Sequence, residues 1–286
     1  MAVNPSGRAI GVASNGTIAR NLPSPAGEPV ATQGRRVSPR TFEPVPQAVI
    51  LAAGQGLRLN GQPNGTPKCL VCVAGRSLLE HQLAALWSLG LRDVCVVVGH
   101  RAHEIRAHAG DACCYIENER YRETNSLKSL SLARDWVRGP FVLVNGDVLA
   151  CSDVYQRVVE SPGNALAYDS RSGQEPEHMK VKVCSGRLER IGKDLASTSC
   201  AGENVGILKF DARAARALFA VAGALISSGL ENSWAPAAVD RIASCFTIQA
   251  LDVAGLPWIE IDYLRDLNEA RRRVWPAICG THVPTP

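Results

Sequence analysis

The sequence predicts an α/β protein built on a mostly parallel open sheet that is flanked by helices. One observation is that continuous apolar runs such as AVILAA, VCVVV and FVLVN recur in the first half of the chain, as expected for strands buried on both faces. The other is that segments with helical periodicity separate these runs. Strands that alternate with helices of about 10 to 15 residues form βαβ units, in which the strands are parallel.

The first βαβ unit is expected to begin with a strand over residues 48–53 and to end with a strand over residues 94–98. Between them, Ser77 and Glu80 have the spacing of a capping box, with Ser77 as the N-cap of a helix. Leucines follow at helical spacing, and Gly90 is suited to end the helix.

The next elements continue the same alternation. We expect a short helix over residues 104–108, a strand that closes at residues 115–116, a helix over 126–137 and a strand over 141–145. The second half alternates more between apolar and polar residues, which predicts a mixed or antiparallel extension of the sheet over one side of a cleft. Its expected strands cover 165–168, 180–184, 187–191, 205–210, 246–252 and 258–262, and its helices cover 212–227, 235–243 and 264–274.

The chain divides into three parts by composition. Residues 1–46 are rich in Pro, Gly and Ser and show no apolar period, which predicts a disordered extension. Residues 47–276 carry all the predicted elements and form one domain. Residues 277–286 are expected to be a flexible tail.

Composition and charge exclude several classes of function. The formal net charge is only +4 and aromatic residues make up 5%, without the clustered basic face of a nucleic-acid binder. No apolar run approaches the roughly 20 residues that span a bilayer, and the N-terminus lacks the apolar core of a signal peptide. We therefore expect a cytoplasmic protein without bound nucleic acid or membrane; a homo-oligomer is compatible with the sequence. The Cys69–Cys72 pair has no second ligand pair, so a zinc site is not predicted.

A glycine-rich turn follows the first strand, and cations follow the turn. In the segment LAAGQGLRL, glycines let backbone N–H groups approach phosphate oxygens without interference from a Cβ atom. The guanidinium of Arg58 can clamp those oxygens, and Lys68, after Pro67, can return as a second cation. The spacing matches neither GxGxxG nor GxxxxGK[ST], so the pattern predicts phosphate binding by another kind of loop.

Two aspartates are candidates for binding a metal ion. Asp147 follows a buried strand and should lie at its carboxyl end, where open α/β sheets bind ligands. Asp262 ends another strand, in which alternation places Trp258, Glu260 and Asp262 on one face. Mg²⁺ takes hard oxygen ligands and shares them with substrate phosphates. The alternative is that Asp147 is a turn residue and Asp262 a helix N-cap.

The segment Leu51–Arg58 with Pro67-Lys68 resembles the LAAGxGxR…PK signature of the NTP-transferase family of nucleotidyltransferases. The resemblance covers residues 47–274 and implies a Rossmann-like sheet with Mg²⁺-bound NTP over the glycine-rich loop. It also implies that the aspartates at positions 147 and 262 are metal ligands. Later segments, including TNS at 124–126 and WIEID at 258–262, are similar to the phosphocholine/phosphonate cytidylyltransferase branch, which implies CTP.

By this resemblance, the catalytic cations are Arg58 and Lys68. The residues expected around the nucleotide are Ala52, Ala53, Gly54, Gln55, Gly56, Gly99, Asn125 and Ser126. The residues expected on the acceptor side are Lys180, Lys193, Glu203, Asn204 and Glu260, with Trp234 and Trp258 as walls. Lysines there suit an anionic acceptor.

The expected reaction is transfer of CMP from CTP to a small phosphonate or phosphorylated acceptor, such as 2-aminoethylphosphonate, 2-hydroxyethylphosphonate or phosphocholine. An acceptor oxygen attacks the α-phosphorus, and pyrophosphate leaves in line. One alternative is a sugar-1-phosphate thymidylyl- or uridylyltransferase, which shares the loop and both aspartates. An alternative of another class is a catalytically silent nucleotide-binding regulator, which predicts losses among Arg58, Lys68, Asp147 and Asp262; all four residues are present.

Overall fold

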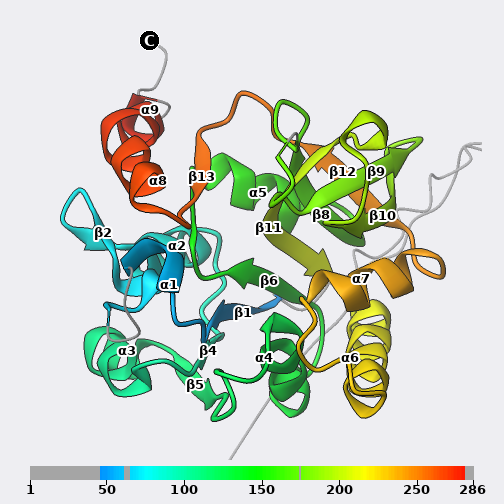
Figure 1. The fold of residues 1–286 in the computed structure, drawn as a ribbon, viewed down its shortest axis with the longest axis horizontal. Helices are drawn as coiled ribbons and strands as arrows, with labels where there is room; N and C mark the ends of the chain where they lie inside the picture. The colour runs from blue at the N-terminus through cyan, green and yellow to red at the C-terminus, as the bar shows by residue number, and fades with distance from the viewer. Residues whose placement is uncertain (1–45, 61–64, 174, 281–286) are drawn as a thin grey trace, which may run out of the picture. The chain divides into compact units, whose positions relative to one another are not determined.

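The computed structural model describes residues 46–60, 65–173 and 175–280, and the predicted N-terminal extension lies outside these ranges except for residue 46. A nine-stranded sheet forms the centre of the described domain (Figure 1). Its strands are β1 (Gln47–Ala52), β4 (Val94–Val98), β5 (Cys114–Glu117), β6 (Phe141–Asn145), β8 (Asn164–Asp169), β9 (Lys180–Cys184), β10 (Arg187–Gly192), β11 (Gly202–Phe210) and β12 (Ile248–Asp252). They are ordered β5-β4-β1-β6-β11-β8-β12-β10-β9.

The sheet has a parallel half and a mixed half, as predicted. Strands β5, β4, β1 and β6 are parallel, whereas β11 runs antiparallel to both β6 and β8. From β1 the chain first builds strands on one side, β4 and then β5, and then crosses to place β6 on the other side of β1. This change of direction leaves a crevice at the carboxyl ends of β1 and β6, where open α/β sheets bind ligands.

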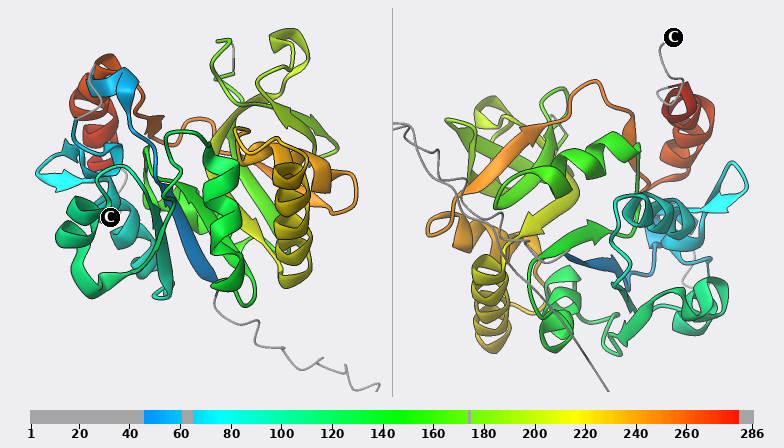
Figure 2. Two further views of the ribbon diagram at one scale, coloured as in Figure 1. Left: turned by 60° about the horizontal axis from the view of Figure 1, so that its bottom comes forward. Right: turned by 180° about the vertical axis from the view of Figure 1, so that it is seen from behind.

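Helices cover both faces of the sheet (Figure 2). The helices are α1 (Leu57–Asn60), α2 (Leu78–Ser88), α3 (Ala102–Ala109), α4 (Ser126–Leu132), α5 (Ser152–Glu160), α6 (Ala212–Ser227), α7 (Pro236–Ala243), α8 (Leu264–Glu269) and α9 (Trp275–Gly280). Alternation along β1 explains the layers: Ala48 and Ile50 pack with α2, α3 and α5, and Val49 packs with α4, α6 and α7. Ala48, Val49 and Ile50 are all fully buried, which fixes the register of β1.

Local signals in the sequence fix several element ends. The predicted capping box is present, with the Ser77 hydroxyl accepting from the Glu80 N–H and the Glu80 carboxylate accepting from the Ser77 N–H. Gly90 follows α2 with a φ of 84°, a left-handed conformation that suits glycine. None of the described helices is both long and apolar enough to cross a membrane.

Other elements differ from the predictions. α4 ends at Leu132 and continues as a 3₁₀ turn over Ala133–Asp135 instead of reaching residue 137. The closing helix passes through a π-helical turn over Ala270–Val274 into α9, so residues 277–280 of the predicted tail are helical. Helix α5 and the short strands β2 (Cys72–Val73), β3 (Arg76–Ser77) and β7 (Val148–Ala150) are absent from the predicted elements. Strand β13 (Trp258–Glu260) lies within the strand predicted over 258–262 and pairs with β7, while β2 pairs with β3.

Candidate active site

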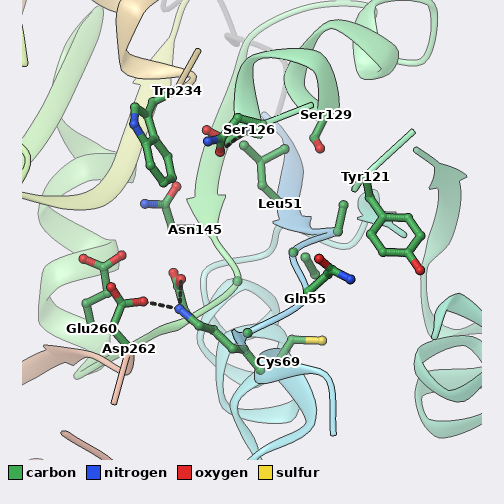
Figure 3. Close-up of a pocket in the computed structure, with 18 of the residues that line it drawn as sticks. Leu51, Gln55, Cys69, Tyr121, Ser126, Ser129, Asn145, Trp234, Glu260 and Asp262 are labelled. Carbon is green, nitrogen blue, oxygen red and sulfur yellow. Dashed lines mark hydrogen bonds and ion pairs between the residues drawn. The ribbon is translucent and has the colours of Figure 1, made fainter. Parts of the chain in front are cut away.

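A pocket of about 460 Å³ lies at the carboxyl ends of β1 and β6 (Figure 3). Its polar groups separate into two ends. Figure 3 shows Glu260 and Asp262 side by side at one end, whereas Tyr121 and Ser129 lie at the other, with Gln55 between them. The pocket can therefore hold an elongated molecule with an anionic part, which cations and a metal ion would neutralise at the carboxylate end.

The predicted glycine-rich loop forms one wall of the pocket. Every residue from Leu51 to Arg58 lines it, including the five predicted nucleotide-binding positions 52–56. Gly56 has a φ of 62°, which lets the chain turn sharply between β1 and α1. Such a turn leaves backbone N–H groups available to an anion.

Gly99 lies behind the loop instead of on the pocket surface. A Cβ atom at this position would come within 2.8 Å of the Ala53 carbonyl oxygen and of the Tyr121 Cβ. The next residue, His100, donates its backbone N–H to the same Ala53 oxygen at 3.1 Å. Gly99 therefore permits the close packing that holds Ala53, and its predicted place beside the nucleotide stays a prediction.

Three carboxylates meet at one end of the pocket. Asp147, Glu260 and Asp262 each offer an oxygen, and these oxygens all lie within 4.8 Å of one another. The β7–β13 pairing brings them together, because the Ile261 N–H donates to the Asp147 carbonyl at 2.9 Å where this small sheet ends. Glu260, expected on the acceptor side, thus lies with the two aspartates. A set of hard oxygen donors fits Mg²⁺.

Two cations face the carboxylates. Lys68 Nζ lies 3.2 Å from Asp147 Oδ2 and also pairs with Asp262 Oδ1, while an Arg58 guanidinium nitrogen lies 2.6 Å from Asp262 Oδ2. Burial alone would lower the pKa of Lys68, but the neighbouring charges of Asp147 and Asp262 outweigh it and raise that pKa. The Lys68 ammonium is therefore held in its charged form.

The pKa of Glu260 is raised, as expected for a carboxyl group close to other carboxylates. Burial, followed by the negative charges of Asp147 and Asp262, raises the pKa of Glu260 to about 8. The positive charge of Lys68 opposes this shift but does not cancel it. One further positive charge at this end of the pocket would relieve the repulsion, as a divalent cation would do.

The opposite end of the pocket is built on the start of α4. The Asn125 side chain caps this helix by accepting from the Ser126 N–H at 2.8 Å, and the Ser126 hydroxyl accepts from the Ala235 N–H at 2.8 Å. Both predicted residues line the pocket, as do Asn118 and Ser129, which the sequence reasoning missed. Asn118 Nδ2 donates to the Ser129 hydroxyl at 3.1 Å.

A signal for part of this end was available in the sequence. Asn118 and Tyr121 follow directly after β5, whose carboxyl end lies on the same edge of the sheet as that of β1. Polar and aromatic residues just beyond a parallel strand are candidates for a ligand site. Asn145 at the end of β6 has the same position, and Met179, Thr124, Cys69 and Pro236 also line the pocket without having been predicted.

The predicted acceptor residues divide into two groups. Lys193, Asn204 and Trp234 line the pocket. The Lys193 ammonium lies 4.6 Å from the centre of the Trp234 ring and 3.4 Å from Glu177 Oε2. Asn204 is 5% exposed, and its Oδ1 has no hydrogen-bond partner among the described residues.

Lys180, Glu203 and Trp258 are outside the lining, and each has a partner that explains its position. Lys180 is buried and donates to the Lys193 carbonyl at 3.1 Å. Glu203 accepts from the Ser172 hydroxyl, and burial raises its pKa despite that hydrogen bond. Trp258 donates its indole N–H to Asp169 Oδ2 at 2.8 Å. These three residues therefore lie behind the pocket walls, and their part in binding an acceptor stays a prediction.

Comparison with known proteins places this arrangement in a family. The model of the MobA-like NTP transferase domain matches residues 48–223, which include the glycine-rich loop, Lys68 and Asp147. The chain belongs to this family. The nucleotidyltransferase resemblance predicted from the loop signature is thereby confirmed.

Two curated relatives are similar to this NTP transferase over part of their length. A CMP-5'-(3-aminopropyl)phosphonate synthase from Streptomyces rubellomurinus is 37% identical over 141 residues, which are 46% of this chain and 22% of the relative. A bifunctional IPC transferase and DIPP synthase from Rubrobacter xylanophilus is 30% identical over 241 residues, covering 80% of this chain and 52% of the relative. The chain thus spans about half or less of the length of these relatives.

Solved structures share the fold. The inositol-1-phosphate CTP transferase from T. maritima has a TM-score of 0.68 and 21% identity, over 86% of this chain and all of its own. The CTP:phosphocholine cytidylyltransferase from Streptococcus pneumoniae has a TM-score of 0.65 and 20% identity, over 79% of this chain and 97% of its own. These likenesses confirm the Rossmann-like α/β architecture.

Proposed function

We propose that this NTP transferase moves CMP from CTP onto a small amine-bearing phosphonate and releases pyrophosphate. The observation that carries the proposal is the meeting, in one pocket, of the glycine-rich loop, the cations Lys68 and Arg58, and the carboxylate triad of Asp147, Glu260 and Asp262. The name of the 37% identical relative, a CMP-5'-(3-aminopropyl)phosphonate synthase, supports a CMP donor and an aminoalkylphosphonate acceptor.

Asp147, Asp262 and Glu260 would hold the Mg²⁺ ion. When bound, Mg²⁺ neutralises charge on the triphosphate and orients it for in-line displacement. An acceptor oxygen forms the new bond to the α-phosphorus, while the bond from the α-phosphorus to the bridging oxygen breaks and pyrophosphate leaves. The chain supplies no covalent nucleophile in this scheme; its residues position both substrates and balance their charge.

The two cations have separate tasks in this reaction. Lys68 is the more buried of the pair, with a side-chain exposure of 15% against 37% for Arg58. We assign Lys68 to the α-phosphate, where negative charge must be stabilised during attack. Arg58 stands at the more open side of the loop, and its planar guanidinium suits the departing β- and γ-phosphates.

The acceptor side supports an acceptor with both an anionic group and a hydrogen-bond donor. Lys193 offers a positive charge to the phosphonate. The buried Asn204 Oδ1 lacks a partner among the described residues and lines the pocket, so a bound acceptor with an N–H or O–H group would satisfy it. An ammonium group offers three N–H donors where a hydroxyl offers one O–H, so we favour an amine as that donor.

Phosphocholine fits this arrangement less well. Its trimethylammonium group has no N–H to donate to Asn204, and it is usually bound by aromatic faces. The face of Trp234 is already covered by Lys193. We therefore favour an aminoalkylphosphonate over phosphocholine.

The proposal can be tested by measuring pyrophosphate release with Mg²⁺, using CTP, UTP, dTTP, ATP or GTP with each acceptor in turn. The acceptors are 2-aminoethylphosphonate, 2-hydroxyethylphosphonate, phosphocholine, inositol-1-phosphate and glucose-1-phosphate. We expect release with CTP and 2-aminoethylphosphonate above all other pairs. Release only with dTTP or UTP and glucose-1-phosphate would assign the sugar-1-phosphate activity instead, and CTP binding without release for any acceptor would favour the silent regulator.

A further inference from the structure

The side chain of Gln82 lies under the turn that carries Asp147. Gln82 is on α2, is 1% exposed and is not part of the pocket lining. Its Nε2 donates to the carbonyl oxygen of Asn145 at 2.8 Å and to that of Val148 at 2.8 Å. Asn145 ends β6 and Val148 begins β7, so the two accepting carbonyls stand directly before and after Gly146-Asp147.

The amide of Gln82 can make these contacts in one orientation only. Each hydrogen of its NH₂ group serves one carbonyl, and rotation of the amide by half a turn would place Oε1 against two carbonyl oxygens. In the observed orientation Oε1 is buried without a hydrogen-bond partner among the described residues. An unsatisfied buried oxygen destabilises the fold, so its presence calls for an explanation outside packing alone.

Gly146 and Asp147 also make one backbone hydrogen bond each, and neither of these bonds replaces the contact from α2. The Gly146 N–H donates to the Leu51 carbonyl at 2.9 Å, which ties the turn to β1. The Asp147 carbonyl accepts from Ile261 at 2.9 Å, which ties it to the chain after β13. Gln82 alone among the described side chains spans both ends of the turn, and so fixes the angle at which Asp147 leaves the sheet.

We propose that Gln82 is a positioning residue: it holds the Asn145–Val148 turn so that the Asp147 carboxylate faces Glu260 and Asp262. The catalytic meaning of this role rests on the proposed function, but the role itself concerns only the geometry of the carboxylate triad. Residues that orient a metal ligand from behind typically change metal affinity about 10- to 100-fold when they are replaced.

The test measures Mn²⁺ binding to the full chain without nucleotide, from the loss of the free-ion EPR signal. Gln82→Met keeps the length of the side chain and removes both donors, and we expect it to raise the Mn²⁺ Kd about tenfold. Leu86→Ala is the control on the same helix: Leu86 is fully buried, so this variant loses stability without losing a contact to the turn. We expect its Mn²⁺ Kd to match that of the unsubstituted chain.

A double-mutant cycle with Asp147→Asn separates positioning from a general loss of structure. If Gln82 acts through Asp147, Gln82→Met causes no further loss of Mn²⁺ affinity in the Asp147→Asn background. Should Gln82→Met fail to fold, Gln82→Glu takes its place, because a carboxyl group of the same size has at most one O–H and cannot donate to both carbonyls.

Three results would overturn the role of Gln82. They are an unchanged Mn²⁺ Kd in a folded Gln82 variant, full additivity in the cycle, and failure of the unsubstituted chain to bind Mn²⁺. Failure of the proposed function is a different result. CTP turnover would then be absent, while the unsubstituted chain still binds Mn²⁺ and the Gln82 variant binds it more weakly.

Discussion

Lys68 Nζ lies 3.2 Å from Asp147 Oδ2, although 79 positions separate the two residues in the sequence. Lys68 also pairs with Asp262, so its ammonium stands among the carboxylates that a metal ion would use. A bound Mg²⁺ would compete with Lys68 for these oxygens. Lys68 would then become available to the triphosphate. The same lysine thus pairs with the carboxylates in the metal-free protein and with the triphosphate in the proposed reaction.

This competition predicts how replacing Lys68 changes the response to metal. In Lys68→Met the aliphatic length is kept and the charge is lost, which leaves three carboxylates without their buried cation. We expect the metal-free variant to melt at a lower temperature than the unsubstituted chain, and Mg²⁺ to raise its Tm by more. Thermal melts with EDTA measure the metal-free Tm, and melts with Mg²⁺ measure the increase caused by the metal. An equal increase of Tm with Mg²⁺ in the two proteins would show that Lys68 does not compete with metal.

The same variant should lose nearly all turnover. Removing one group that stabilises developing charge typically costs about 10²- to 10³-fold in kcat. We expect a loss of at least about 100-fold for Lys68→Met, with CTP affinity reduced much less. Steady-state rates and nucleotide titration on the folded variant test this, and unimpaired turnover would remove Lys68 from the mechanism.

Asp147→Asn and Asp262→Asn should each abolish the dependence on Mg²⁺. A catalytic metal contributes several kcal/mol of charge stabilisation, so loss of a ligand should lower kcat by about 100-fold or more. Asp153→Asn is the matched control, because Asp153 is an exposed acidic residue on α5 outside the pocket. Metal titrations of activity compare the three variants, and equal losses in all of them would point to a general charge effect.

The crowding of carboxylates predicts a pH dependence of stability in the metal-free protein. The pKa of Glu260 is raised from an ordinary value of 4.5 to about 8, so the folded state binds this proton more tightly than the unfolded state does. The resulting contribution to stability is fully present below about pH 4.5 and is lost as the pH rises through about 8. Urea unfolding in EDTA across this range should show the decline.

Glu260→Gln provides the comparison for that profile. The amide cannot ionise, so the variant should lose the decline between pH 4.5 and 8 while other groups continue to contribute. If its profile is the same as that of the unsubstituted chain, Glu260 is not the group responsible.

The acceptor side gives a prediction that separates lining residues from supporting ones. Asn204→Leu removes the unpartnered oxygen and should raise the KM for 2-aminoethylphosphonate about tenfold, since a hydrogen bond to a charged group contributes about 1.5 to 3 kcal/mol. The KM for CTP should change little. Trp258→Phe should leave both KM values within about twofold, because Trp258 contacts Asp169 and not the pocket. A larger increase of the acceptor KM in Trp258→Phe than in Asn204→Leu would show instead that Trp258 is a wall of the acceptor site.

Local patterns predicted the parts of this protein that local chemistry determines. An apolar strand followed by a glycine-rich turn located the loop, and Asp147 was placed correctly because a parallel strand ends just before it. The meeting of Glu260 with Asp147 could not be predicted in this way. It depends on the pairing of β13 with β7, a strand of three residues that was not predicted and lies more than 100 positions away in the sequence.

The acceptor side shows a second limit of the same reasoning. Lys180 is a charged residue in a strand, which favoured a place in the pocket, but tertiary packing buries it against backbone carbonyls. Asn204 lies two strands away in the sheet order from β1, in a stretch of β11 that extends beyond β6, and this extension depends on the register of the antiparallel pair. Register of this kind is set by packing between distant strands.

The central claim is tested most directly by identifying the product formed from CTP, Mg²⁺ and 2-aminoethylphosphonate. We expect ³¹P NMR to show two coupled phosphorus signals, one from the CMP phosphate and one from the phosphonate, with one pyrophosphate released per product. Mass spectrometry should give the mass of the CMP conjugate. No conjugate with CTP, together with a sugar nucleotide formed from UTP or dTTP, would contradict the account.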